Sequence, residues 1–116
     1  MKNSFIVGIF SLLAGCASVQ KETLELPTAK PPQLWSHHKA LDIHVGACAL
    51  KGLSALKALG FTQVVKNENY IYGNFHNNRV AVKCVSRGVA SFVYLAVAGP
   101  NKEIVEKLRN EVAWKM

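Results

Sequence analysis

Aspartate is nearly absent from this chain, and no pair of carboxylates suited to catalysis stands out. Asp42 is the only aspartate among 116 residues. No Ser-His-Asp spacing and no phosphate-binding loop stands out, so the residue patterns of common hydrolases and nucleotide-binding enzymes are missing. We expect a protein that is not an enzyme and that needs no cofactor.

Long hydrophobic runs are scarce as well. The apolar run from Phe5 to Leu13 has nine residues, too few to cross the roughly 30 Å hydrocarbon core of a bilayer as a helix. It follows a positively charged start and precedes the small residues Ala14 and Gly15, an arrangement typical of a secretory signal peptide. We therefore expect no transmembrane span, and assign residues 1–15 to a cleaved signal peptide.

The end of this segment reads Leu-Ala-Gly-Cys at residues 13–16, which resembles the lipobox of bacterial lipoproteins. In that family the cysteine is acylated on sulfur, the preceding peptide is removed and the new amino terminus is usually acylated too. The resemblance covers residues 1–16 and implies a lipid anchor on Cys16. Two or three acyl chains hold a protein on a bilayer where a single chain lets it go. The alternatives are an ordinary signal peptide with a chance cysteine, or a buried apolar helix.

The residues after the lipobox bear on localisation. Ala17 and Ser18 follow Cys16, with no aspartate directly after the lipidated residue. By the family's sorting rule, this implies the outer membrane, facing the periplasm. Residues 16–34 are rich in proline and polar groups and predict a flexible tether, and residues 35–116 predict one small domain.

Patterned segments within 35–116 indicate the fold class. Residues 41–45 alternate apolar and polar side chains and predict a strand, and residues 47–59 predict an amphipathic helix that ends at Gly60. The sequence between Gly60 and Gly99 is rich in Val, Tyr, Phe and Ile and predicts three or four strands. Hairpin turns are expected within 66–69, at 77–78 and at 87–88.

The last segment predicts a second helix, opened by Gly99-Pro100-Asn101. Its apolar stripe is Ile104, Val105, Leu108 and Val112, and Glu103-Lys107 and Glu111-Lys115 are spaced for i,i+4 ion pairs. The whole predicts an α+β two-layer sandwich, an antiparallel sheet of three to five strands with two helices packed on one face, in the order β-α-β-β-β-α.

The hairpin registers assign side chains to the two faces of the sheet. One face is apolar and predicts the core: Ile71, Gly73, Phe75, Val80, Val82, Cys84, Ser91, Val93, Leu95 and Val97. The other is aromatic and basic, and is the candidate binding face: Tyr70, Tyr72, Asn74, His76, Arg79, Lys83, Arg87, Phe92 and Tyr94. Exposed aromatic rings among cations can stack on sugars or anchor a protein. Alternatively, these residues are good strand formers kept soluble by Arg and Lys.

Cysteines are few. Beside Cys16 the chain has only Cys48 and Cys84, and two thiols in an exported domain predict one disulfide. Cys48 lies in the first turn of the expected helix, and Cys84 points from a middle strand to the covered face. The alternative is two buried free thiols.

Closely spaced metal ligands are also lacking. His44 stands four residues before Cys48, but the sequence has no Cys-x-x-Cys pair of the kind that marks zinc sites. A Cys/His nucleophile pair is disfavoured too, because oxidising conditions would remove the nucleophilic reactivity of the thiol. We expect no metal site, and most of the histidines, His37, His38, His44 and His76, are interpreted as surface residues.

Acidic residues are outnumbered. The chain has 14 Lys and Arg against 7 Asp and Glu, and loss of Lys2 with the signal leaves 13 and a net charge of +6. In the cell envelope this balance favours an anionic glycan, a lipid or an acidic protein as partner, rather than nucleic acid; a diffuse solvated surface is the alternative. Self-association through the aromatic face stays open.

Two functions fit these expectations. The first is a lipid-anchored envelope protein whose domain binds a protein or an anionic envelope component without catalysis. The second is a lipoprotein of the immunity or inhibitor class, directed against a toxin or a cell-wall hydrolase. The sequence does not name the partner.

Overall fold

The structure is a computed structural model that describes residues 30–116. The expected signal peptide, Cys16 and nearly all of the expected tether lie outside the described residues. The elements are β1 (Gln33–Leu41), α1 (Val45–Ala58), β2 (Thr62–Asn67), β3 (Tyr70–Phe75), β4 (Asn78–Arg87), β5 (Ala90–Gly99) and α2 (Lys102–Lys115). The strands form one antiparallel sheet in the order β1-β5-β4-β3-β2. The predicted α+β class is confirmed, with four strands between the helices.

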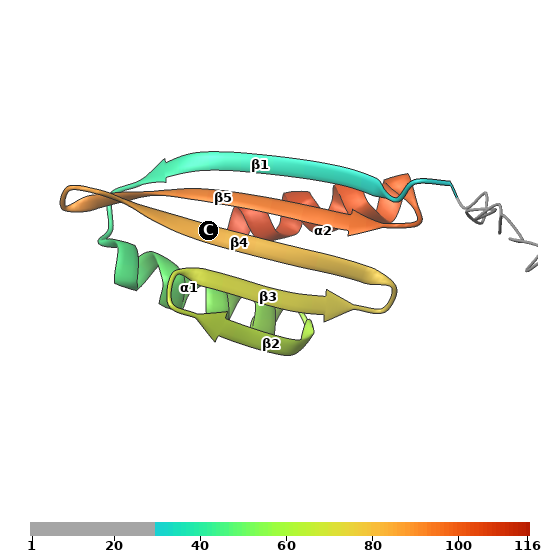
Figure 1. The fold of residues 1–116 in the computed structure, drawn as a ribbon, viewed down its shortest axis with the longest axis horizontal. Helices are drawn as coiled ribbons and strands as arrows, with labels where there is room; N and C mark the ends of the chain where they lie inside the picture. The colour runs from blue at the N-terminus through green and yellow to red at the C-terminus, as the bar shows by residue number, and fades with distance from the viewer. Residues whose placement is uncertain (1–29) are drawn as a thin grey trace, which may run out of the picture. The chain divides into compact units, whose positions relative to one another are not determined.

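Both helices cover the same face of the sheet, as Figure 1 shows, with α2 packed on β1 and β5 and α1 packed on β4, β2 and β3. The core lies between these two layers. From the strands it takes Ile71, Val80, Val82, Cys84, Val93, Leu95 and Val97, and from the helices Cys48, Ala49, Leu56, Val105, Leu108 and Val112. The predicted apolar face of the sheet is therefore the covered face.

The first strand is longer and earlier than the sequence indicated. The prediction of a strand over 41–45 is wrong, because β1 covers Gln33–Leu41 and begins two residues before the expected start of the domain. Residues 42–44 form the link to α1, and the His44 ring caps that helix by accepting a hydrogen bond from the Gly46 backbone N–H at 3.2 Å. Pairing with β5 holds β1 in place, and a partner so distant in sequence leaves no trace in the local pattern.

Two hairpin turns are displaced by one residue from their predicted places. They lie at 76–77 and 88–89, where Phe75 pairs with Asn78 and Arg87 with Ala90. Each register therefore differs by two residues from the prediction. Because side chains alternate with a period of two, a shift of two leaves every side chain on its predicted face. The faces were thus predicted correctly from turns that were slightly misplaced.

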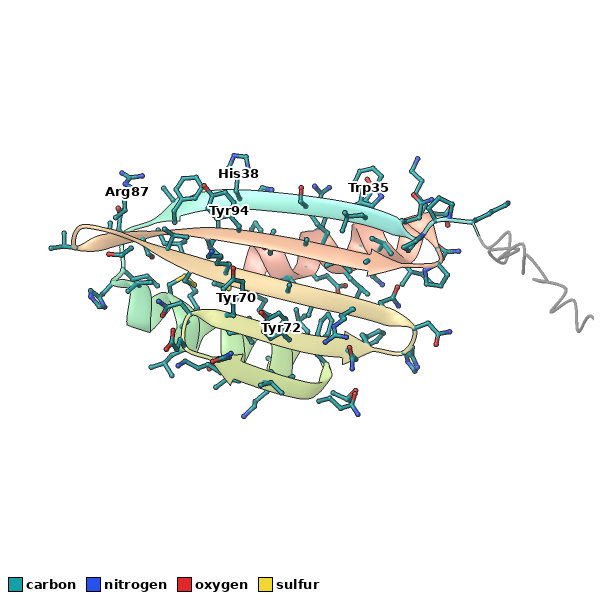
Figure 2. All side chains as sticks on the ribbon, in the orientation of Figure 1. Trp35, His38, Tyr70, Tyr72, Arg87 and Tyr94 are labelled. Carbon is teal, nitrogen blue, oxygen red and sulfur yellow. A yellow bond between two sulfur atoms is a disulfide. The ribbon has the colours of Figure 1, made fainter. Side chains whose placement is uncertain are left out.

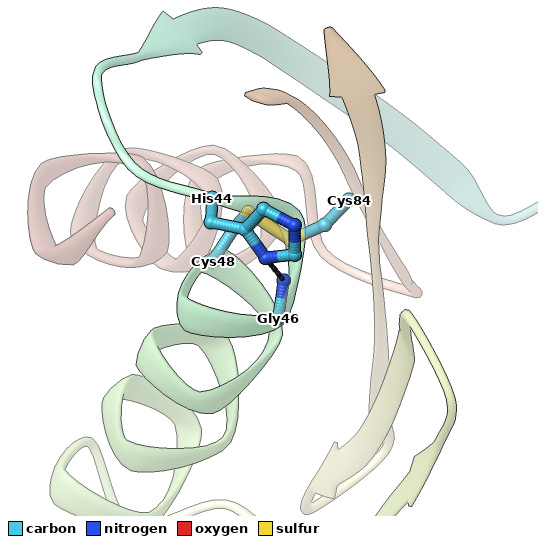
Figure 3. Close-up of a disulfide and its surroundings, with 4 residues drawn as sticks. All are labelled: His44, Gly46, Cys48 and Cys84. Atoms are coloured by element: carbon cyan, nitrogen blue, oxygen red, sulfur yellow. Dashed lines mark hydrogen bonds between the residues drawn. A yellow bond between two sulfur atoms is a disulfide. The ribbon is translucent and has the colours of Figure 1, made fainter. Parts of the chain in front are cut away.

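A disulfide joins the helix layer to the sheet, as predicted. Cys48, in the first turn of α1, is bonded to Cys84 of β4 (Figure 3). Further along α1, Gly52 packs closely on the sheet, since a Cβ at that position would stand 3.1 Å from Ile71 Cδ1. Gly60 follows the helix with φ +86°, the backbone conformation that glycine adopts most readily.

The second helix begins where the sequence predicts. The Asn101 side chain accepts a hydrogen bond from the Ile104 backbone N–H at 3.1 Å, which caps α2. Ile104 itself is exposed, so its predicted place in the buried stripe is wrong and the stripe is Val105, Leu108 and Val112. Within residues 30–116, the ion pair of this helix joins Lys107 to Glu111 at 3.9 Å instead of the two predicted pairs.

Candidate functional site

The sheet face opposite the helices is uncovered within the described domain, and we call it the open face. The strand pairing places on it alternate residues from all five strands: Leu34, Ser36, His38, Ala40, Thr62, Val65, Asn67, Tyr70, Tyr72, Asn74, Arg79, Ala81, Lys83, Val85, Arg87, Ala90, Phe92, Tyr94, Ala96 and Ala98. Eight of the nine predicted residues of the binding face are among them, and His76 is not. The structure therefore brings most of the candidate site onto one surface (Figure 2).

Acidic side chains are missing from the sheet. None of the five strands contains an aspartate or a glutamate. The open face carries Arg79, Lys83 and Arg87, every fourth residue along β4, so neighbouring cations are about 13 Å apart. Since opposite charges attract and like charges repel, this face favours an anionic partner.

The first aromatic group of the open face lies on β3 and β4. The Tyr70 and Tyr72 rings are parallel, with centroids 5.7 Å apart, and the Lys83 ammonium lies 4.8 Å from the Tyr70 centroid. A side-chain hydrogen bond with Tyr70, followed by the charge interaction with the same residue, raises the pKa of Lys83 above its ordinary value of 10.5. Lys83 is therefore a fixed positive charge at physiological pH.

The second aromatic group lies on β1 and β5. The His38 ring stacks on Phe92 with centroids 5.7 Å apart and lies 6.1 Å from Tyr94, whose side chain is 50% exposed. Sequence reasoning missed His38, because the strand that carries it was predicted at 41–45. Trp35, Lys39 and Leu41 are half-buried on the covered side, at intervals that follow the period of a strand. Because Lys39 is charged, the sequence does not show the apolar alternation that would have predicted this strand.

A shallow hollow lies between bulkier side chains on the open face. Its volume is about 280 Å³, and it is lined by Ser36, His37, His38, Ala81, Lys83, Tyr94, Leu95 and Ala96. Ser36, Ala96 and Ala81 are cross-strand neighbours on β1, β5 and β4. Small side chains on three adjacent strands thus form the floor, while His38, Tyr94 and Lys83 form one wall.

Two of the predicted residues, Arg87 and His76, lie away from this hollow. Arg87 is the last residue of β4, and Figure 2 places it at the far end of the sheet from Tyr72. His76 is in the turn after β3 with φ +50°, and its ring meets Phe75 edge-on at 4.8 Å. His76 therefore lies at the end of the sheet, next to a partly buried phenylalanine instead of among the open-face cations.

The cysteines and histidines of the described domain have structural or surface positions. Cys48 and Cys84 are bonded to each other, and His44, drawn beside them in Figure 3, caps α1. Within residues 30–116, no three His, Cys, Asp or Glu side chains are grouped as a metal site would need. Over the same residues, neither helix has the length and apolar character to span a membrane.

The chain was compared with known families, proteins and structures. No family model, no curated protein and no solved structure matches it. The chemistry of the open face is therefore the basis for any functional proposal: three cations, no acid, two aromatic groups and a shallow hollow.

Proposed function

We propose that this chain is a bacterial envelope lipoprotein, anchored by acylation of Cys16 at the outer membrane and facing the periplasm. Its disulfide-bonded domain binds, without catalysis, a protein or an anionic envelope component through the open face. The observation that carries the binding role is the open face itself, where every charged side chain is basic and Tyr70, Tyr72 and Tyr94 are accessible.

The arrangement of the polar groups supports binding rather than catalysis. The open-face cations are spaced along β4 instead of converging on one point, and the hollow beside Lys83 is shallow, with alanine and serine on its floor. Acid–base or nucleophilic chemistry needs groups within hydrogen-bond reach of one reacting atom. Binding to an extended anionic surface needs only that the charges and rings be displayed together.

The proposed compartment is supported by two independent features. The lipobox-like residues 13–16 and the short apolar run before them favour export and lipidation. The disulfide between Cys48 and Cys84 belongs with an oxidising environment, where such bonds persist. The basic charge of the sheet suits the acidic glycans and lipid head groups of that environment.

The edges of the sheet are less suited to a partner than its face. At the β1 edge, Arg109 reaches from α2 and donates a hydrogen bond to the Ser36 carbonyl oxygen at 3.0 Å. At the β2 edge, the pairing is interrupted by an irregularity between Thr62 and Val65, where Gln63 has φ +51°. Both features hinder addition of another strand at these edges.

A second function is favoured by one observation. Val89 is 90% exposed at the turn between β4 and β5, which are the two longest strands. A projecting hairpin with an apolar tip fits the cleft of an enzyme, which is how an inhibitor or immunity protein would act on a hydrolase or a toxin. Such a protein would form a tight one-to-one complex.

The decisive experiment is cross-linking in the native envelope followed by identification of the captured molecule. A binder of an anionic component should sediment with glycan or anionic vesicles, and the sedimented fraction should fall as salt rises, because salt screens exposed charges. An inhibitor should instead elute with one protein at equal stoichiometry. Recovery of the free domain, with neither glycan, membrane nor protein partner, would contradict both functions.

A further inference from the structure

The register of the sheet arranges the open face in rows that cross the strands. Residues opposite one another on β1, β5 and β4 share a row. Leu34, Ala98 and Arg79 form one row, Ser36, Ala96 and Ala81 the next, and His38, Tyr94 and Lys83 the third. The middle row has only small side chains, so it is the floor of a trough that runs across the strands. Tyr72 of β3 is the next residue of this row, opposite Ala81.

The trough has the dimensions of a single ring with its substituents. Successive rows are about 6.6 Å apart along the strands and the strands about 4.8 Å apart, so the flanking rows are about 13 Å apart and the floor spans about 10 Å. The hollow holds about 280 Å³, the volume of roughly nine water molecules. This is close to the lower limit of small-ligand sites and too small for a folded partner to enter.

The walls carry groups that recognise a sugar. Tyr94 and His38 present ring faces and edges beside the floor, and aromatic rings stack on the C–H face of pyranose rings. The Ser36 hydroxyl stands at the β1 end, where it can donate to or accept from a sugar hydroxyl. An apolar floor with polar groups at its rim suits a ligand that is apolar on its face and polar at its edge.

The charged residues near the trough are all basic. Ala81 stands between Arg79 and Lys83 on the same strand, and no acidic residue occurs in any strand of the sheet. The Lys83 ammonium rests on the Tyr70 ring and keeps further N–H donors for a ligand. A carboxylate over Ala81 would lie between Lys83, which lines the hollow, and Arg79, which stands outside its lining two residues along β4.

We propose that this trough binds one carboxylated sugar unit of an acidic glycan, with the ring over Ser36 and Ala96 and the carboxylate over Ala81 between Arg79 and Lys83. This inference rests on the proposed binding role of the open face and adds the class of ligand and its position. The sugar ring packs beside Tyr94 and His38. A polymer of such units would continue over the remaining open face.

Other occupants fit the trough less well. An extended peptide adds to a sheet along an edge and parallel to the strands, whereas the trough crosses the strands, and the β1 edge is occupied by Arg109. A second copy placed face to face would bring its own Arg79, Lys83 and Arg87 against the same cations. Like charges brought together in this way oppose association.

The test measures binding of fluorescently labelled trigalacturonate by the purified full chain in detergent, with galactotriose as the neutral probe of matched ring type. We expect trigalacturonate to bind at least about tenfold more tightly than galactotriose at low salt. Ala96→Leu fills the floor without changing charge, and Lys83→Gln removes one cation at an exposed position; each should weaken trigalacturonate binding about tenfold or more. Lys51→Gln, which removes an exposed cation of α1 on the helix layer, should change it less than about twofold.

Several results would overturn the inference. These are equal affinity for the acidic and the neutral probe, loss of binding in Lys51→Gln as large as in Lys83→Gln, or no effect of either trough variant. Circular dichroism of each variant shows whether it is folded, and Lys83→Gln keeps the test decisive if Ala96→Leu unfolds. If trigalacturonate fails to bind while cross-linking still captures an envelope partner through the open face, the glycan assignment fails and the proposed binding function stands.

Discussion

Cys48 of α1 and Cys84 of β4 are bonded across 36 positions of sequence, and both side chains are buried. The bond joins the helix layer to the middle of the sheet on the covered side. It therefore fixes β4, the strand that carries Arg79, Lys83 and Arg87, without occupying the open face.

Removing this bond should destabilise the domain strongly. In the chain-entropy model, a disulfide that closes a loop of this length contributes about 4 kcal/mol. For a domain of this size, that corresponds to a fall in Tm of roughly 15–30 °C. We expect this fall in the double variant Cys48→Ala, Cys84→Ala by thermal denaturation. Reductant should lower the Tm of the native chain and leave that of the double variant unchanged; a native chain insensitive to reductant would contradict the prediction.

Replacing Cys16 with Ser should release the protein from membranes, because the proposed acyl chains attach to that sulfur. The measurement is fractionation of cells followed by detection of the protein in the membrane and soluble fractions. Ser18→Ala, two residues away, should stay with the membrane. Retention of Cys16→Ser in membranes after a high-salt wash would count against the lipid anchor.

Changing Tyr72, Lys83 and Tyr94 together to Ala, Gln and Ala should weaken partner capture while the fold is kept. Aromatic and basic hot spots each cost about 2 kcal/mol or more when truncated, so we expect capture to weaken at least roughly 25-fold. The measurement is cross-linking yield in the native envelope. The matched control, Lys51→Gln with Trp114→Ala, changes an exposed cation and an exposed ring on the helix layer. Equal losses of partner capture in the two variants would show that the open face has no special role in capture.

The hydroxyl of Tyr70 should account for most of the raised pKa of Lys83, since the side-chain hydrogen bond is its first cause. Tyr70→Phe keeps the ring and removes that bond, so the pKa should fall toward the ordinary 10.5. Tyr72→Phe should change it much less. A raised pKa means that the contact stabilises the fold at lower pH and is lost as the pH rises above that pKa. Side-chain NMR of Lys83 between pH 9 and 12 gives the values; an unchanged pKa in Tyr70→Phe would refute the assignment.

Side-chain alternation made the two faces of the sheet predictable from sequence. Val80, Val82 and Val97 are buried as predicted, and Tyr70 and Lys83 lie on the open face. The turns predicted at 77–78 and 87–88 lie one residue from the observed turns at 76–77 and 88–89. The faces were still predicted correctly, because an error of one residue in a two-residue turn shifts the pairing by two. The helix ends at Asn101 and Gly60 were also predictable, since caps depend on local backbone chemistry.

The position of β1 was not predictable in the same way. Its inward side includes Lys39, whose ammonium donates a hydrogen bond to the Ala113 carbonyl oxygen of α2 at 2.9 Å. Its partner β5 begins at Ala90, far along the chain. Neither contact requires apolar residues to alternate within β1. The strand and its open-face residue His38 were therefore not predicted from the sequence.

The layer class, the pairing of Cys48 with Cys84 and the apolar and basic faces follow from the order of the amino acids. Side-chain period and cap chemistry act locally, and the number of cysteines leaves one pairing. Which small and large residues meet across strands depends on the tertiary fold. The trough over Ser36, Ala96 and Ala81 exists because β1, β5 and β4 are adjacent in a particular register. Such a register is set by contacts between residues distant in sequence, which no local pattern records.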